Sequence, residues 1–161
     1  MVGAMSNESD HAWKLMSDLR TCVFVTTSGE GFHGRPMSAI VKKDEGAVYF
    51  LSDQSSAKDE EVLRDAHVLL VFGNGSSKFV CLQGQASVSS DRALVKRLWN
   101  PGAQAFWPNG PDDRNVIAIT IDPHHAEYWQ GDAGIVGAAK MLVAVMRGKR
   151  PDLGEQKAVN L

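Results

Sequence analysis

The feature that most constrains the fold of this chain is a series of short runs of β-branched and aromatic residues separated by tight turn signals. Residues 22–27 (CVFVTT) and 32–43 flank the turn Gly29-Glu30-Gly31, and residues 67–72 and 78–89 flank the cluster GNGSS. Runs joined by glycine-rich turns are typical of antiparallel hairpins. The chain lacks the regular β-α-β alternation of a parallel sheet, so we predict an antiparallel barrel or sandwich. Further strands are expected at residues 47–52, 116–121 and 126–130.

Short helices are predicted as covers for this sheet. Near the amino terminus Trp13, Met16 and Leu19 recur three residues apart, which indicates a helix with one apolar face. Such a face has to pack on something larger, and the predicted sheet is the available surface. The other predicted helices lie at residues 58–66, from 91 to the residues before 101, and 135–147.

Length and composition indicate one ordinary globular domain. The 161 residues are 43% hydrophobic and 22% charged, which excludes a collagen-like or largely disordered chain. We expect a single domain with its core at about 10–148 and a polar tail at 149–161. Residues 100–115 predict a loop, and the aromatic pair Phe106-Trp107 within it suggests packing against a site or a partner.

Charge and targeting signals narrow the class of protein further. The net charge of −2 offers no basic field for nucleic acid or acidic membranes, so any anion site must be local. The amino-terminal segment MVGAMSNESD lacks the pattern of a signal peptide, and no apolar stretch approaches the roughly 20 residues of a spanning helix. Cys22 and Cys81 each lie in an apolar run and predict buried, reduced thiols. We therefore expect a cytoplasmic protein.

Residues 52–58 (SDQSSAK) are the first candidate binding site. A strand ends here and a helix begins, with several hydroxyl groups and with Lys58 in the first helical turn. The unpaired N–H groups of a helix start, together with a lysine and hydroxyl groups, form a suitable receptor for a phosphate. Simple helix capping by Ser56 is the alternative interpretation, and the segment alone does not separate the two.

The second candidate site is the segment Gly34-Arg35-Pro36-Met37-Ser38. Proline donates no hydrogen bond to a sheet, so Pro36 predicts an edge or a bulge with free backbone groups nearby. Arg35 can serve as a second cation for a phosphate, because a guanidinium makes bidentate contacts that an ammonium cannot make. The alternative is a solvated arginine at a strand edge.

A third candidate is the segment 126–131 (AEYWQG). Its alternation sends Tyr128 and Trp129 to opposite faces of a strand, so one of the two is available for stacking or for an interface. The sequence leaves open whether both are instead buried in a dimer.

Conventional catalytic and metal-binding patterns are absent from the sequence. No G-x-S-x-G motif occurs, and His124-His125 follows Asp122-Pro123 without the spacing of a zinc site, which favours a surface turn. We assign no catalytic residue and no metal ligand. The chain has one candidate phosphate site and few residues arranged for acid-base catalysis. This suggests that a bound cofactor carries out any chemistry.

The order of these motifs resembles the flavin-binding split-barrel superfamily related to pyridoxamine 5′-phosphate oxidase, and within it the general stress protein 26 branch. The resemblance covers residues 10–148 approximately and implies an antiparallel split β-barrel. It rests on five ordered segments: GRPMSAI (34–40), YFLSDQSSAK (49–58), KFVCLQGQASV (78–88), FWPNGPDDRNVIAITIDP (106–123) and AEYWQG (126–131).

Carried over residue by residue, the resemblance implies a site for FMN, with FAD as an alternative. It implies a homodimer with the flavin in a cleft between two barrels, where Trp129 reaches the flavin from the second subunit. Within one subunit, Arg35, Pro36, Met37 and Ser38 would run along the flavin, with Arg35 also near its phosphate. Leu51 and Ser52 would lie beside the ribityl chain and ring, and Ser56 and Lys58 would hold the phosphate.

The chain also departs from the oxidase pattern. Ala57 and Ile40 stand where the oxidase has cations, and Asp132-Ala133-Gly134-Ile135-Val136 replaces the stretch that grips the pyridoxal substrate. The resemblance therefore implies an FMN-dependent oxidoreductase, related to stress proteins, whose substrate is unassigned. Two alternatives remain. The first is a flavin store or sensor without turnover, and the less favoured one is a true pyridoxamine 5′-phosphate oxidase.

Overall fold

A computed structural model describes residues 2–54, 57–75, 77–131, 135–150, 152 and 154–161 of the chain. Its helices are α1 (Val2–Leu19), α2 (Ala57–Arg64), α3 (Arg92–Leu98), α4 (Pro101–Phe106) and α5 (Ile135–Arg147), with a 3-10 turn, η1, at Lys43–Glu45. Its strands are β1 (Thr21–Thr27), β2 (Phe32–Ser38), β3 (Ile40–Lys42), β4 (Ala47–Asp53), β5 (His67–Gly73), β6 (Lys78–Ser89), β7 (Val116–Gly131) and β8 (Gly154–Asn160).

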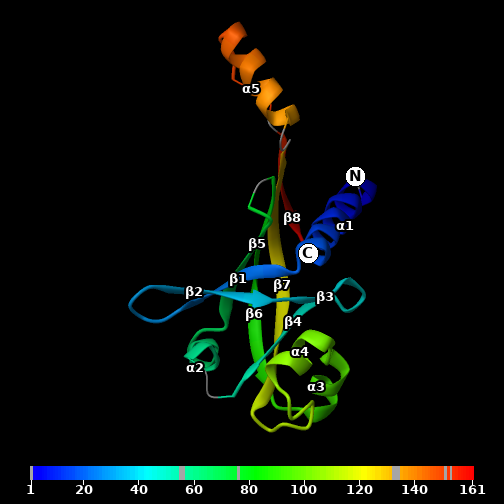
Figure 1. Ribbon diagram of the computed structural model, residues 1–161, viewed down its shortest axis with the longest axis vertical. Helices are drawn as coiled ribbons and strands as arrows, with labels where there is room; N and C mark the ends of the chain where they lie inside the picture. Colours follow the sequence, from blue (N-terminus) through cyan, green and yellow to red (C-terminus); the bar gives the residue numbers. More distant parts are fainter. Residues whose placement is uncertain (1, 55–56, 76, 132–134, 151, 153) are drawn as a thin grey trace.

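The strands form one antiparallel sheet of eight strands. Along the sheet the order is β2-β1-β5-β6-β7-β4-β3, and β8 pairs with β7 off this path. The sheet curls, so that β1 and β2 run across the direction of β6 and β7 in Figure 1. The hairpins expected from the glycine-rich turns are present as β1–β2 and β5–β6. The architecture is that of a split barrel, which confirms the predicted fold class.

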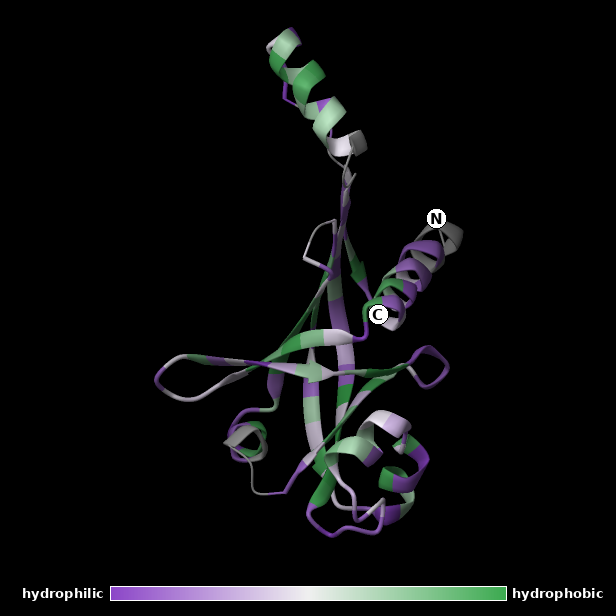
Figure 2. Cartoon of the chain, in the orientation of Figure 1, coloured by the Kyte–Doolittle hydropathy of each residue, from purple (hydrophilic) through white to green (hydrophobic). Residues whose placement is uncertain are grey.

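The core fills the inner face of the curled sheet. Phe24 and Phe50 are fully buried and meet edge to face with their ring centroids 5.2 Å apart. Helix α1 closes one side of this core with the predicted apolar face, since Trp13 and Met16 are buried. A smaller cluster, which includes Val95 on α3, packs α3 against β4 and β7. In Figure 2 apolar residues, in green, occur along the strands of the sheet and also on α5.

The chain after α5 differs from the prediction of a polar tail. Residues 154–160 form β8, which pairs with β7 in register from Gly131↔Gly154 to His125↔Asn160. Only Val159 of this strand is buried, so the segment presents little apolar periodicity from which a strand could be predicted. Backbone pairing with a strand far away in sequence supplies the structure that local patterning does not indicate.

Two predicted strands are joined into one. β7 runs without interruption from Val116 to Gly131, so the expected turn at Asp122-Pro123-His124-His125 is wrong. The register with β6 shifts between Gln83 and Gly84, and this irregularity accommodates the proline within the sheet. A Cβ atom at Gly84 would overlap the carbonyl oxygen of Asp122, so the close approach requires glycine.

The predicted loop at residues 100–115 contains a short helix, α4. Asn100 caps this helix by accepting a hydrogen bond from the amide of Ala103 at 3.0 Å, and Pro101 occupies its first turn. The helix carries Phe106, which is 79% exposed, and ends at Trp107. The aromatic pair is therefore held on an ordered element beside the sheet.

Helix α5 confirms the predicted terminal helix. In Figure 1 it lies beyond the end of the β7–β8 ribbon, away from the rest of the sheet. Several of its apolar side chains, such as Val145 and Met146, are exposed. No helix within the described ranges has both the length and the apolar character needed to cross a membrane.

Candidate functional site

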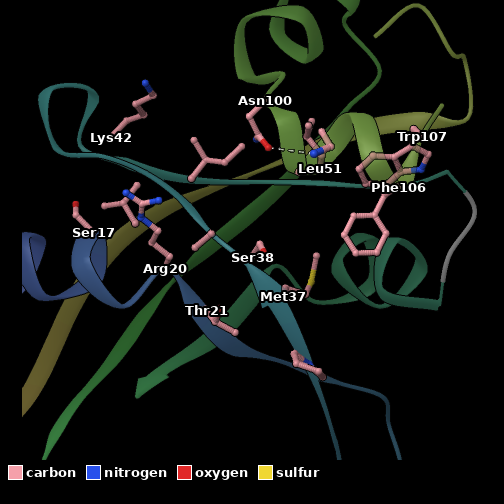
Figure 3. A pocket seen from close by; sticks show the side chains of 16 residues that line it. Ser17, Arg20, Thr21, Met37, Ser38, Lys42, Leu51, Asn100, Phe106 and Trp107 are labelled. Atoms are coloured by element: carbon pink, nitrogen blue, oxygen red, sulfur yellow. Dashed lines mark hydrogen bonds between the residues drawn. The ribbon is translucent and has the colours of Figure 1, made fainter. Parts of the chain in front are cut away.

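A cavity of about 900 Å³ opens between the carboxyl end of α1, strands β2 and β3, and helix α4. Figure 3 shows Met37 and Ser38 from β2 pointing toward it, with Phe106 and Trp107 on another side. Pockets of this size, lined by apolar and aromatic groups with a few polar ones, are typical of small-molecule and cofactor sites.

Four of the nine residues predicted for cofactor binding line this cavity: Pro36, Met37, Ser38 and Leu51. Strand β2 lies at one end of the sheet order, so the edge position predicted from Pro36 is confirmed. Because β2 has a neighbour on one side only, its other side leaves backbone groups available to a ligand. The structure therefore brings together the β2 and β4 parts of the predicted site.

Ser52, also predicted to bind the cofactor, does not line this cavity. It is 2% exposed, on the face of β4 opposite to that of Leu51. The next residue, Asp53, accepts a hydrogen bond from Nε1 of Trp107 at 2.7 Å. This contact fixes the Trp107 ring relative to the end of β4, so the aromatic wall of the cavity is held by a residue of the predicted phosphate segment.

Arg35 points away from the cavity toward α2. Its Nη2 donates to Oε2 of Glu61 at 2.7 Å, and its Nη1 donates to Oγ1 of Thr26 at 2.9 Å. Thr26 also donates to Glu61, and Nδ1 of His33 lies 2.5 Å from the other carboxylate oxygen. We call these four residues the Glu61 cluster. It joins α2 to β1 and β2 beside the predicted phosphate segment.

The carboxyl group of Glu61 is ionised in this cluster. Burial by itself would raise the pKa of Glu61, but hydrogen bonds from Thr26, Arg35 and His33 outweigh it and lower the pKa to about 2. The side chain is 8% exposed, so its charge depends on these partners rather than on water. Sequence reasoning missed Glu61, because its partners lie 26 and 35 residues away along the chain.

Of the two residues expected to hold a phosphate, the structure describes the position of Lys58. Lys58 is in the first turn of α2, as predicted, and Ser56 lies outside the described residues. The helix start is on the same side of the fold as Arg35, because Glu61 of α2 binds Arg35. The helix N-terminus, Lys58 and the end of β4 are thus parts of one region.

Trp129 does not reach the first cavity within one chain. It lines a second, smaller cavity of about 420 Å³ next to β8, together with Gln130 and Gln156. In the sheet it pairs with Phe79 and Gln156, and its neighbour Tyr128 is buried in the core. The expectation that one of the two aromatic residues faces the core is confirmed, while the expected contact of Trp129 with a flavin stays a prediction.

Two cations line the first cavity that sequence reasoning did not single out: Arg20 at the end of α1 and Lys42 at the end of β3. Lys42 lies two residues after Ile40, on the same face of the strand. This two-residue spacing is the local signal from which Lys42 could have been identified. Arg20 had none, because only the pairing of β1 with β2 brings it to the cavity.

The cations of helix α3 are bound to partners outside the cavity. Arg92 donates to the backbone oxygen of Asp113 at 2.6 Å, Lys96 lies 2.7 Å from Asp112, and Arg97 pairs with Glu45. They therefore hold α3 to the neighbouring loop and to η1.

Reactive side chains are scarce around the cavity. Within the described ranges no cluster of three or more His, Cys, Asp or Glu could hold a metal ion, and neither cysteine is in a disulfide. Burial raises the pKa of the Cys22 thiol to about 12, so it is protonated at neutral pH. The cavity lining contains no carboxyl, thiol or imidazole group among its described residues.

Comparison with known proteins shows the family. Residues 7–152 match the family described as "Pyridoxamine 5'-phosphate oxidase like", and the chain belongs to it. A structure from Jannaschia sp. CCS1 that carries the name general stress protein 26 superposes with a TM-score of 0.77 at 22% identity, covering 98% of this chain and 99% of that one. This likeness shows the shared fold. The family match, together with relatives of 27% and 28% identity that are named general stress proteins, confirms the predicted resemblance.

Two further relatives extend the comparison. The general stress FMN/FAD binding protein of Xanthomonas citri is 28% identical, with a TM-score of 0.67 and coverage of 76% of this chain and 88% of that one. Protein bli-3 of Neurospora crassa is 25% identical over 134 residues, which are 76% of this chain. The matched part is 64% of the length of that relative.

Proposed function

We propose that this protein binds a flavin, FMN in the first instance, in the cavity over β2 and acts as a flavin-dependent oxidoreductase. The observation that carries the proposal is that Pro36, Met37, Ser38 and Leu51, expected along a flavin from the family motifs, line a single cavity of about 900 Å³. One of the structural relatives is named as an FMN/FAD binding protein. The cavity of this chain provides the apolar and aromatic walls that a planar ring system requires.

The residues present fit such a group. Met37, Leu51 and Trp107 would contact the ring, and the free backbone edge near Pro36 would offer hydrogen bonds to it. The start of α2, with Ser56 and Lys58, would receive the phosphate. When bound, the isoalloxazine ring would supply the electron-transfer chemistry, and the chain would position it and exclude water from one side.

We further propose a homodimer in which Trp129 of the partner subunit completes the site. The support is that Trp129 of the same chain lies at a different cavity, next to β8. A residue that serves the flavin from there has to come from a second copy. Light scattering at micromolar concentration should give about twice 17.5 kDa, and a flavin-loaded monomer would contradict this arrangement.

A store or sensor without turnover is the second candidate. It is favoured by the lack of carboxyl, thiol and imidazole groups among the described residues of the cavity lining. A flavin can still transfer electrons without such groups, so the two candidates differ in whether an external donor reduces the flavin. Both assume that the protein resides in the cytoplasm, where reduced thiols such as Cys22 persist.

The deciding experiment has two stages. The absorption spectrum and the mass of the small molecule that co-purifies with the protein test flavin binding and separate FMN from FAD. Anaerobic addition of NADH or NADPH, followed as bleaching of the flavin band, then tests turnover. Rapid bleaching supports the oxidoreductase, whereas bound flavin that no donor reduces supports the store or sensor. Absence of any flavin binding would contradict both candidates.

The third candidate function is that of a true pyridoxamine 5′-phosphate oxidase. Incubation of the flavin-loaded protein with pyridoxamine 5′-phosphate in air tests it. Ile40 provides no cation for the substrate phosphate, so we expect turnover far below about 1 s⁻¹, the lower end of ordinary enzymatic rates. Formation of pyridoxal phosphate at that rate or faster would show that the protein is an oxidase for this vitamer.

A further inference from the structure

Glu61 is a buried charge that the proposed function does not use. Among the described residues it is the one charged residue that is buried, with a side chain that is 8% exposed. An isolated carboxylate is costly to bury, and hydrogen bonds and opposite charges offset that cost. In the Glu61 cluster the opposite charge is that of Arg35. The pair therefore affects the charge of its surroundings as well as the stability of the fold.

The Glu61 carboxylate lies about one helical turn from the start of α2. Glu61 is four positions after Ala57, the first residue of this helix. At a rise of about 1.5 Å per residue, this separation is about 6 Å along the helix axis. Helix α2 lies beside β1 and β2 (Figure 1), and Nη2 of Arg35 reaches Glu61 at 2.7 Å. Both charges act on a group bound at the helix start, because the separation is below the Debye length of about 8 Å.

The charges of Arg35 and Glu61 cancel at this end of α2. Nη1 of Arg35 donates to Thr26 and Nη2 donates to Glu61, so two nitrogens of the guanidinium are already engaged. His33 adds a positive charge to the cluster only when it is protonated. The positive charge offered to a phosphate at this helix start therefore comes from the helix N-terminus and from Lys58.

We propose that Glu61 is a specificity-determining residue for the flavin, which lowers the affinity for the phosphate monoester of FMN relative to the phosphodiester of FAD. The inference rests on the proposed function, in which the start of α2 receives the phosphate. A monoester carries about 1.5 to 2 negative charges at pH 7, and a group within a diester carries one. Because repulsion is proportional to the product of the charges, Glu61 opposes the monoester more strongly. It also binds Arg35, which is then not available as a second cation for the phosphate.

The test compares the affinities of FMN, FAD and riboflavin for the full chain by fluorescence titration, in the wild type and in Glu61→Gln. Glutamine has the same length and keeps an oxygen that accepts from Arg35, so the cluster is retained while its negative charge is lost. FMN should bind about 10- to 100-fold more tightly, FAD should gain less, and riboflavin, which has no phosphate, should bind unchanged. A weakened fold cannot produce this result, because it would lower the affinity for all three flavins.

Two variants provide controls. Glu60→Gln removes the same charge from the exposed neighbouring position, where water screens it, and should leave the FMN affinity unchanged. Arg35→Gln combined with Glu61→Gln removes both members of the ion pair. Because their charges cancel in the wild type, the FMN affinity of this double variant should return close to the wild-type value.

Three results would overturn the inference: an FMN affinity that is unchanged or lower in Glu61→Gln, an equal gain in Glu60→Gln, or an equal gain for riboflavin. A lower FMN affinity would mean that Glu61 holds Arg35 in place for the phosphate, and the proposed function would stand. If the wild type binds no flavin, the proposed function fails, and titration with inorganic phosphate decides the inference separately. Tighter phosphate binding by Glu61→Gln than by the wild type would then support the role of Glu61, and equal binding would contradict it.

Discussion

Arg35 pairs with Phe24 in the middle of the β1–β2 ladder, whereas Arg20 directly precedes the first pair of that ladder, and their guanidinium groups have different surroundings. Arg35 is bound by Thr26 and by the buried carboxylate of Glu61, whereas Arg20 faces a cavity and forms no ion pair among the described residues. A half-buried cation that is bound to a buried carboxylate holds elements together. A cation on a cavity wall without a carboxylate partner is available to a ligand. The comparison therefore indicates a structural role for Arg35 and a ligand-binding role for Arg20.

Removal of Glu61, the carboxylate that binds Arg35, should give the largest effect. Glu61→Ala leaves Arg35 without its carboxylate and detaches α2 from β1 and β2, so we expect a loss of about 3–5 kcal/mol in the free energy of unfolding. Urea denaturation measures it. Glu60→Ala, at the exposed neighbouring position, should change stability much less. Equal losses in the two variants would remove the distinction between a structural role for Arg35 and the exposed role of Arg20.

The pH dependence of the free energy of unfolding should reveal the contribution of the Glu61 cluster. The pKa of Glu61 is about 2 in the folded protein, below its ordinary value of 4.5. The stabilisation is therefore complete above pH 4.5 and is lost as pH falls from there toward 2, by on the order of 3 kcal/mol. Urea midpoints measured across this range should fall steeply for the wild type. Glu61→Gln, which has no proton to bind, should flatten that fall.

Lys58→Ala should act on ligand affinity at the same end of the fold. We expect FMN to bind about 10- to 150-fold more weakly and riboflavin, which has no phosphate, to bind unchanged. Fluorescence titration with both ligands measures the ratio. Arg64→Ala, in the last turn of α2, is the matched control and should leave both affinities unchanged. Equal loss of the two ligands in Lys58→Ala would refute the phosphate assignment.

Arg20→Gly should have the smallest effect, with the opposite sign for stability. Relief of the left-handed backbone at Arg20, whose φ is 60°, is worth about 1 kcal/mol, which corresponds to a rise in Tm of about 2–4 °C for a domain of this size. Differential scanning calorimetry measures it. Arg20→Ala keeps the unfavourable φ and should show no such gain. A fall in Tm for the glycine variant would mean that the Arg20 side chain stabilises the fold, as that of Arg35 does.

Much of the fold follows from local patterns. The turn at Gly29-Glu30-Gly31 and the alternation of residues 78–89 predicted two hairpins that the structure contains, and β6 has the predicted bounds. Tight turns and strand alternation are encoded by neighbouring residues, so they can be read without knowledge of the rest of the chain. The edge position of Pro36 follows in the same way from the missing amide of proline.

Other features depend on contacts between distant segments. β8 has one buried residue and exists through pairing with β7, and β7 passes through Pro123 because β6 provides Gly84 opposite. The Glu61 cluster joins residues that are far apart along the chain. None of these has a local signal, because each is stabilised by a partner that only the folded chain supplies.

The amino-acid sequence by itself determined the hairpins, the edge strand with Pro36 and the helix start with Lys58, since each depends on the backbone preferences of a few adjacent residues. The tertiary structure alone decided which cation is paired and which faces the cavity. The sequence pointed to Arg35 as a ligand-binding cation and carried no signal for Arg20, yet Glu61 of α2 pairs with the first while the end of α1 directs the second to the cavity. Electrostatic roles depend on distance and burial, which chain folding sets.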